Sequence, residues 1–304
     1  MNNVIATQNI TKYYGSLAAV NKVSLSVAEG EIYGFLGLNG AGKTTMIRML
    51  LGMIRPSEGC AFINGKPVNA GNYRLWENVG YMVELPYSYP ELTVYENLEI
   101  TRKLRNLKAN AATKDIIRKL ALHDQINKKV KDLSLGNKQR LGIAKALIHM
   151  PKILILDEPT NGLDPAGIVE IRNLLKELAA NTGVTILISS HLLEEISKTA
   201  NRIGIIHEGK LISEFNANEF EHLRNKEVLI DTADNLHAES VLKNKGYSIA
   251  RNESFLSCSD EKAVAHPEEI AEILVNCGCS PKYLYTRAED LESYFLRIIG
   301  KEGV

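Results

Sequence analysis

The chain has 304 residues, and its 36 Lys and Arg residues balance 36 Asp and Glu residues, so the formal net charge is zero. This balance argues against a nucleic-acid partner, because proteins that bind nucleic acids usually carry a basic surface. No apolar run approaches the roughly 18 residues that span a bilayer, and no basic-then-apolar segment opens the chain, so we expect neither a membrane span nor a signal peptide.

The first elements in chain order are strands and a glycine-rich loop. Short β-rich runs near residues 5–11 and 24–27 predict an antiparallel element, and the apolar run at residues 31–36 is typical of a buried strand. The next segment, GLNGAGKT at residues 37–44, fits the phosphate-binding P-loop pattern G-x-x-x-x-G-K-[ST]. Apolar residues then recur at helical spacing. The strand before the loop and the helix after it favour a P-loop over a chance glycine-rich turn.

The P-loop composition predicts how a phosphate would be held. Glycines let successive amide N–H groups point inward at an anion, and a helix that begins near Lys43 turns its positive end toward the same anion. The Lys43 ammonium is expected to reach the β- and γ-phosphates, and the Thr44 hydroxyl to bind Mg²⁺. The predicted phosphate-binding positions are Gly37, Asn39, Gly40, Ala41, Gly42, Lys43 and Thr44.

Between about residues 88 and 150 the pattern changes from alternating strands and helices to helices. Helical periodicity dominates at residues 96–107 and 113–122, which predicts a helical subdomain inserted into an α/β core. Later in this region, the segment LSLGNKQR at residues 133–140 precedes a further amphipathic helix. Ser134 is placed as the N-cap of that helix, and such a helix start is suited to binding an anion.

The strand that follows ends in two acidic residues. Residues 152–156 are an apolar run, and Asp157 comes at the position where P-loop proteins place an acid that helps to hold Mg²⁺. If the chain turns there, Glu158 can face the γ-phosphate and polarise a water molecule. An ordinary surface acid pair is the alternative, and the P-loop upstream favours the functional interpretation. A further apolar strand at residues 184–190 ends directly before His191.

A polar boundary near residues 216–218 divides the chain into a predicted nucleotide-binding domain, residues 1–216, and a small C-terminal domain, residues 217–304. The second domain is expected to contain a strand at 226–232, a helix at 236–245, a hairpin over 247–258, a helix at 267–275, a strand at 282–286 and a helix at 288–299. This β-α-β-β-α-β order predicts a two-layer α+β domain. The cysteines Cys60, Cys258, Cys277 and Cys279 favour free thiols in a reducing cytosol over a metal or redox pair.

The order of the P-loop, the LSLGN segment, the ILILDE strand and His191 resembles the ATP-binding subunit of ABC transporters over about the first 216 residues. LSLGN resembles the LSGGQ signature of that family, from which Leu135 and Asn137 depart while Ser134 and Gly136 remain. The resemblance implies a P-loop NTPase core with an antiparallel β element and an inserted helical subdomain. It also implies that the chain binds ATP with Mg²⁺ and hydrolyses it.

The resemblance implies further roles at the nucleotide. Tyr14 matches the aromatic residue that stacks on adenine, with Tyr13 as its rival. His191 matches the histidine that contacts the γ-phosphate, and Thr45 is expected to assist at a phosphate. Glu158 is expected to orient or deprotonate the attacking water.

Other roles concern a second subunit, with which this chain is expected to form a homodimer. Ser134 and Gly136 are expected to contact the ATP held by the other copy, so that two copies sandwich two nucleotides. Asp164, in the segment NGLD at residues 161–164, is expected near the dimer interface.

Glu84 stands where the family usually has a glutamine, in the loop that links the core to the helical subdomain. This glutamate, the single nucleotide-binding domain and the C-terminal tail resemble the bacitracin-resistance and lantibiotic-immunity branch. Because an ionised carboxylate only accepts hydrogen bonds, Glu84 is expected to approach Mg²⁺ or an ordered water and to report the nucleotide state to the permease. Neutral variation at Glu84 in a general exporter is the alternative.

The expected function is therefore that of an ATPase subunit that drives a separate membrane permease, on the inner face of the cell membrane, for peptide-antibiotic export or resistance. An ABC-type translation factor would usually carry two cassettes in one chain, whereas this chain has one P-loop. A chromosome-maintenance ATPase would need a long coiled coil between the P-loop and the signature. A slow-turnover sensor is a further alternative, against which Glu158 argues.

Overall fold

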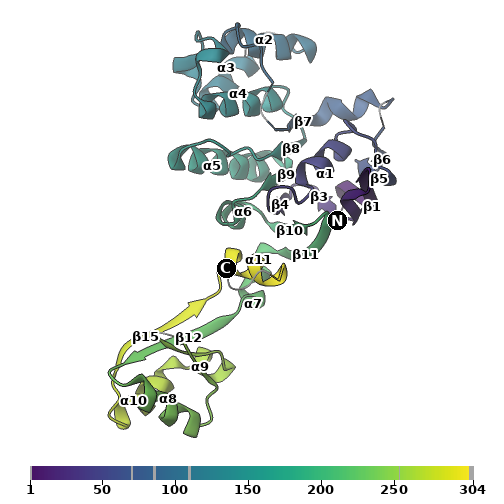
Figure 1. Cartoon of the computed structure of the whole chain (residues 1–304). Helices are drawn as coiled ribbons and strands as arrows, with labels where there is room; N and C mark the ends of the chain where they lie inside the picture. The colour runs from purple at the N-terminus through teal and green to yellow at the C-terminus, as the bar shows by residue number, and fades with distance from the viewer. Residues whose placement is uncertain (1, 70, 85–86, 109–110, 253, 301–304) are drawn as a thin grey trace. The chain divides into compact units, whose positions relative to one another are not determined.

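A computed structural model describes residues 2–69, 71–84, 87–108, 111–252 and 254–300. Its residue contacts divide the chain into two compact units, Met1–Asn218 and Glu219–Val304. Both units mix helices and strands, as the sequence predicted (Figure 1). Within the described ranges, every helix is too short or too polar for a bilayer-spanning segment.

A six-stranded sheet with the order β11-β10-β4-β9-β8-β7 forms the centre of the first unit. Its strands are β4 (Ile32–Leu36), β7 (Val79–Met82), β8 (Ile153–Asp157), β9 (Thr185–Ser190), β10 (Arg202–His207) and β11 (Lys210–Asn216). All neighbours run parallel except β10 and β11. Every residue of β4, β8 and β9 is buried, which explains their nearly continuous apolar sequences. Because these strands are parallel, their carboxyl ends meet at one edge of the sheet.

An antiparallel sheet packs beside this one. It contains β1 (Asn3–Tyr14), β2 (Leu17–Val23), β3 (Ser26–Ala28), β5 (Glu58–Ile63) and β6 (Lys66–Pro67), in the order β2-β1-β5-β6 with β3 also paired to β1. The sequence predicted only the part before the P-loop, whereas β5 and β6 follow the helix α1 (Lys43–Leu50). This helix contacts β2, β5 and β8 and therefore lies between the sheets. Its buried side chains share one hydrophobic core with both sheets.

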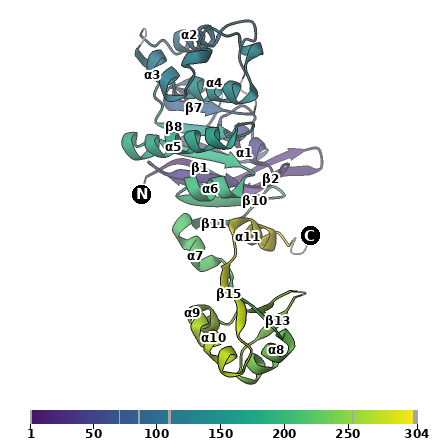
Figure 2. The same cartoon turned by 90° about the vertical axis from the view of Figure 1, so that its left-hand side faces the viewer.

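Two layers of helices complete the first unit. Figures 1 and 2 show α2 (Val94–Leu104), α3 (Ala111–Lys119) and α4 (Leu135–Leu147) gathered beyond β7, with α4 packed against β7 and α2. Short 3₁₀ turns, η1 (Tyr73–Asn78), η2 (His123–Gln125) and η3 (Val130–Asp132), connect this region. The helices α5 (Pro165–Thr182) and α6 (Leu193–Thr199) contact β9 on the side of the sheet opposite α1.

The second unit is a small α+β layer structure. An antiparallel sheet with the order β13-β14-β12-β15 contains β12 (Lys226–Thr232), β13 (Ile249–Arg251), β14 (Leu256–Cys258) and β15 (Pro281–Ala288). Its helices are α7 (Phe220–Leu223), α8 (Asn235–Asn244), α9 (Glu261–Ala265), α10 (Pro267–Asn276) and α11 (Leu291–Ile298). The predicted β-α-β-β-α-β order is present, and α7 and α9 are additions to it. Alternate residues of β12, such as Val228 and Ile230, are fully buried in the core of this unit.

Candidate functional site

The predicted P-loop forms a tight turn between β4 and α1. Gly42 caps α1 with a left-handed φ of 107°, and a Cβ added there would lie 2.4 Å from the carbonyl oxygen of Ala19. A Cβ on Gly37 would lie 2.6 Å from the carbonyl oxygen of Ile206. Both positions therefore require glycine, and Gly42 provides no side-chain cap for the amide groups of the first turn of α1. The other predicted loop residues are the exposed Asn39 and Gly40 and the buried Ala41.

Lys43 is buried, with 6% of its side chain exposed, and its ammonium is fully engaged. Nζ donates to the carbonyl oxygen of Gly37 at 2.6 Å and to that of Leu38 at 3.2 Å. Nζ also lies 3.2 Å from Oε1 of Glu158. A phosphate that binds in this loop must therefore compete with Glu158 for Lys43.

Thr44 and Asp157 meet where α1 faces the end of β8. The Thr44 hydroxyl donates to Oδ2 of Asp157 at 2.7 Å, and the Ser189 hydroxyl donates to Oδ1 at 2.6 Å. Asp157 is 1% exposed, so these hydroxyls provide the hydrogen bonds that a buried carboxylate needs. Ser189 was not predicted as a site residue, although it stands opposite Asp157 in the β8–β9 register. Thr45 follows in α1 and is half-buried.

The chain turns at Glu158, directly after the strand β8. Its φ of 49° is left-handed, which is unusual for a residue with a side chain. Because a carboxylate only accepts, Nδ1 of His191 donates to Oε2 of Glu158, at 2.7 Å. Glu158 therefore bridges Lys43 and His191, which lie more than a hundred residues apart in the chain.

The predicted signature and the NGLD segment each begin a helix. The Ser134 hydroxyl caps α4 by accepting from the amide of Asn137 at 3.3 Å, as predicted, and Gly136 lies in the first turn. Asp164 caps α5 by accepting from the amide of Gly167 at 2.8 Å. Both caps leave a helix N-terminus that favours negative charge.

Contacts from α4 join these loops to the end of β8. A Cβ on Gly162 would lie 2.4 Å from Cδ2 of Leu135, so the leucine that departs from the signature pattern packs on the NGLD segment. One turn further along α4, Nε2 of Gln139 donates to the carbonyl oxygen of Glu158 at 2.8 Å. Sequence reasoning did not assign a role to Gln139, because its partner is a backbone atom that no side-chain pattern reveals.

Tyr13 and Tyr14 end the strand β1 and are both partly exposed, at 41% and 49%. Nζ of Lys12 lies 5.4 Å from the centre of the Tyr14 ring. Exposed aromatic rings of this kind are available for stacking on a base. The preference for Tyr14 over Tyr13 stays a prediction.

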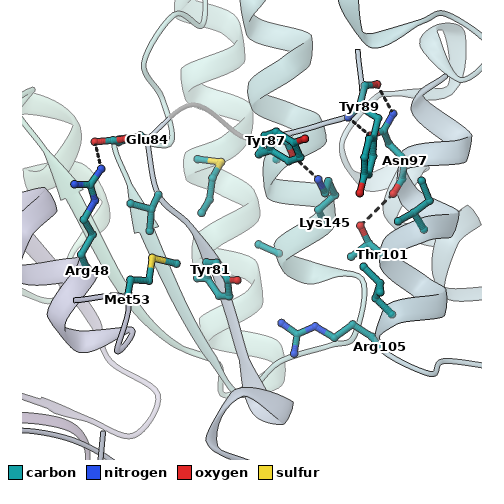
Figure 3. Close-up of a pocket in the computed structure, with 16 residues that line it drawn as sticks. Arg48, Met53, Tyr81, Glu84, Tyr87, Tyr89, Asn97, Thr101, Arg105 and Lys145 are labelled. Atoms are coloured by element: carbon teal, nitrogen blue, oxygen red, sulfur yellow. Dashed lines mark hydrogen bonds and ion pairs between the residues drawn. The ribbon is translucent and has the colours of Figure 1, made fainter. Parts of the chain in front are cut away.

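Glu84 lies at the rim of a groove between α1, β7, α2 and α4 (Figure 3). The groove has a volume of about 550 Å³. Oε1 of Glu84 accepts from Nη2 of Arg48 at 2.6 Å, and φ of Glu84 is also left-handed, at 55°. The structure thus pairs Glu84 with a cation of α1, and its predicted approach to Mg²⁺ stays a prediction. Arg48 was not predicted as a partner.

This groove combines aromatic rings with half-buried cations. The Lys145 ammonium donates to the carbonyl oxygen of Tyr87, and Nη1 of Arg105 donates to that of Trp76 at 2.5 Å. Burial lowers the pKa of both Lys145 and Arg105. Tyr81 and Tyr87 expose 41% and 77% of their surface, so the groove presents apolar area to the outside. Such a surface suits a partner that brings both apolar and acidic groups.

Comparisons with known proteins agree with this geometry. A family model described as ABC transporter matches residues 20–161. The Bacitracin transport ATP-binding protein BcrA of Enterococcus faecalis is 39% identical over 307 residues, which cover 100% of this chain and 99% of that protein. The Lantibiotic transport ATP-binding protein SrtF of Streptococcus pyogenes is 37% identical over 231 residues, which cover 75% of this chain and 99% of that protein.

Solved structures resemble the first unit. The dimeric structure of MJ0796, a bacterial ABC transporter cassette, shares 28% sequence identity with a TM-score of 0.66, and the match covers 70% of this chain and 98% of that one. A structure of the same cassette in a post-hydrolysis state, bound to ADP and Pi, matches with a TM-score of 0.65.

Proposed function

Because this chain belongs to the ABC transporter family as an ATP-binding subunit with ATPase activity, we propose that it drives a separate membrane permease that exports or clears a peptide antibiotic. The relatives named for bacitracin and lantibiotic transport support this substrate class, and BcrA matches along the whole chain, including the C-terminal unit. The proposed place of action is the cytoplasmic face of the membrane.

The observation that carries the proposal is the convergence of Lys43, Asp157, Glu158 and His191 at one edge of the central sheet. The phosphates of ATP would lie over the P-loop, where Lys43 and the backbone amides neutralise their charge. Glu158 would then orient or deprotonate the attacking water, and His191 would contact the γ-phosphate. Thr45 and Tyr14 would assist at a phosphate and at the adenine.

Thr44 and Asp157 offer the oxygen ligands that Mg²⁺ prefers. Among the residues that the structure describes, no cluster of three or more His, Cys, Asp and Glu side chains could hold a metal by itself. This fits a Mg²⁺ ion that arrives with ATP and takes most of its ligands from phosphate oxygens and water. When bound, Mg²⁺ would neutralise charge that develops on the phosphates. Glu84 is a further candidate ligand, once released from Arg48.

A second copy of the chain is the proposed partner for hydrolysis. Ser134 and Gly136 would contact the ATP that the other copy holds, with Asp164 near the interface. The capped N-terminus of α4, which favours an anion, supports this role, and so does the dimeric state of the MJ0796 cassette.

The permease is proposed to contact the groove beside Glu84. Exposed tyrosines and half-buried cations there suit a segment with apolar and acidic side chains. The Arg48–Glu84 pair links this groove to α1, the helix that begins at the P-loop. A change at the phosphates can therefore reach the permease through a single helix.

The test combines hydrolysis with resistance. The purified chain should release phosphate from Mg²⁺-ATP, and cells that express it with its cognate permease should survive bacitracin. Lys43→Ala should abolish both, whereas Lys66→Ala, which removes an exposed lysine on β6, should change neither. If the chain hydrolyses ATP but has no effect on survival, the ATPase activity stands and the proposed substrate class is wrong.

A further inference from the structure

We propose that Gln139 is a positioning residue that couples the start of α4 to the carboxylate of Glu158. The inference rests on the proposed role of Glu158 in hydrolysis. Gln139 acts through a backbone contact, because its Nε2 donates to the carbonyl oxygen of Glu158 at 2.8 Å. Gln139 is 3% exposed, so this hydrogen bond is shielded from water.

The peptide groups of Glu158 are held from both sides. The amide donates to the Ser189 hydroxyl at 3.1 Å and to the Ser189 carbonyl oxygen at 3.2 Å. The carbonyl oxygen accepts from Gln139 and also from the amide of Asn161, at 3.1 Å. Of these partners, only Gln139 comes from the helical subdomain between β7 and β8.

This support matters because the backbone of Glu158 is strained. A left-handed φ costs a residue with a side chain of order 1 kcal/mol, and it persists only where the surroundings impose it. The direction of the side chain follows from this backbone, and it brings Oε1 to Lys43 and Oε2 to His191. Without the donor on Gln139, the peptide keeps its hydrogen bonds to Ser189 and Asn161 but loses its support from α4, so the carboxylate is positioned less accurately.

The same hydrogen bond connects the LSLGN segment at the start of α4 to Glu158, the proposed catalytic base. Ser134 and Gln139 lie about 7.5 Å apart along α4, so they move together as parts of one helix. When the phosphates of the ATP held by the second copy attract the N-terminus of α4, Gln139 and the Glu158 peptide move with this helix. Binding of that ATP at the LSLGN segment would therefore change the position of the Glu158 carboxylate in the same chain.

The first test replaces Gln139 with methionine, which has a similar length and no donor. The expected turnover is roughly 10–100-fold lower, because a small misplacement of a reacting group has this effect. ATP affinity of the isolated chain should stay unchanged. The matched control is Thr7→Val, which removes the hydroxyl that donates to the carbonyl oxygen of Val23 at 3.1 Å, buried in the antiparallel sheet. It should lower stability and leave turnover unchanged.

Gln139→Glu provides a second variant of the same shape. A protonated carboxyl group can donate to the Glu158 carbonyl oxygen, whereas an ionised one cannot. The ratio of the turnover of Gln139→Glu to that of the unmodified chain should therefore rise as the pH falls from about 8 to about 6. The reason is that burial favours the protonated form of the introduced carboxyl group. A pH-independent ratio, or unchanged turnover in both variants, would overturn the proposal.

A double-mutant cycle separates this inference from the role of Glu158 itself. In single-turnover assays, Gln139→Met should cause no further loss in a Glu158→Gln background, because Gln139 acts through that side chain. A full, additive loss would show that Gln139 acts elsewhere. Unchanged turnover in Glu158→Gln alone would instead refute the proposed catalytic function.

Discussion

Replacing Glu158 with glutamine is expected to slow ATP hydrolysis and, at the same time, to tighten ATP binding. Glutamine keeps the length of the side chain, but its amide cannot take a proton from water. Loss of a positioned general base costs roughly 10²–10⁴-fold in rate. Turnover should fall by that factor, and the ATP-bound dimer should accumulate because hydrolysis no longer opens it.

The effect on affinity follows from the pair between Glu158 and Lys43. Their charged atoms lie 3.2 Å apart, and the side chains are 19% and 6% exposed. The gross attraction is about 5 kcal/mol at an effective dielectric constant of about 20, and desolvation offsets most of it. A net charged hydrogen bond is worth about 1.5–3 kcal/mol. ATP must separate Lys43 from Glu158 in order to bind. The weaker pair in Glu158→Gln should therefore lower the dissociation constant for ATP by about tenfold, or about 1.4 kcal/mol in binding free energy.

Equilibrium binding of a fluorescent ATP analogue and phosphate release from ATP measure the two effects separately. Glu177→Gln, an exposed glutamate on α5, is the matched control and should change neither. Weaker nucleotide binding in Glu158→Gln would refute the competition between Glu158 and ATP for Lys43. Phosphate release at the normal rate would refute the role of Glu158 as a base.

Further predictions concern the loop, the groove and pH. Gly42→Ala should abolish ATP binding, because its φ of 107° and the 2.4 Å approach of a backbone oxygen leave no room for a Cβ; Gly183→Asn, at a left-handed position in open space, should bind normally. Glu84→Ala should lose more antibiotic resistance than hydrolysis, whereas Glu84→Gln should be milder; equal loss of both activities in Glu84→Ala would indicate a catalytic role. Burial and the charge of Arg105 lower the pKa of His149 to about 4, below its ordinary value of 6.5. Stability should be complete above pH 6.5 and fall by up to about 3 kcal/mol as the pH drops to 4, and chemical denaturation of His149→Gln should show a smaller loss.

Elements with a strong local pattern were predictable from the sequence. The strand predicted at residues 226–232 matches the bounds of β12, Lys226–Thr232, and the apolar run of residues 152–156 predicted β8. In contrast, α9 has a single turn or so of helix, which is too short for a periodic pattern. The strand β5 pairs with β1, which precedes the P-loop, and such long-range pairing leaves no local trace.

The same distinction applies to the site. The P-loop and the acidic pair after β8 follow directly from motif spacing, and the structure brings Thr44 to Asp157 and Lys43 to Glu158. Ser189 and Gln139 act through hydrogen bonds whose partners are remote in sequence, and one of those partners is a backbone oxygen. The pairing of Glu84 with Arg48 depends on how a helix and a loop pack, which motif spacing does not specify.

The left-handed backbone of Glu158 carries a consequence for the evolution of stability. Glycine adopts a φ of 49° without the steric cost that any side chain incurs, so Glu158→Gly should relieve of order 1 kcal/mol of strain. The same change removes the charged pair with the buried Lys43, which is worth about 1.5–3 kcal/mol, so the variant should be less stable overall. A selection for heat resistance alone would therefore retain the glutamate, and the ion pair with Lys43 protects the proposed catalytic residue from loss.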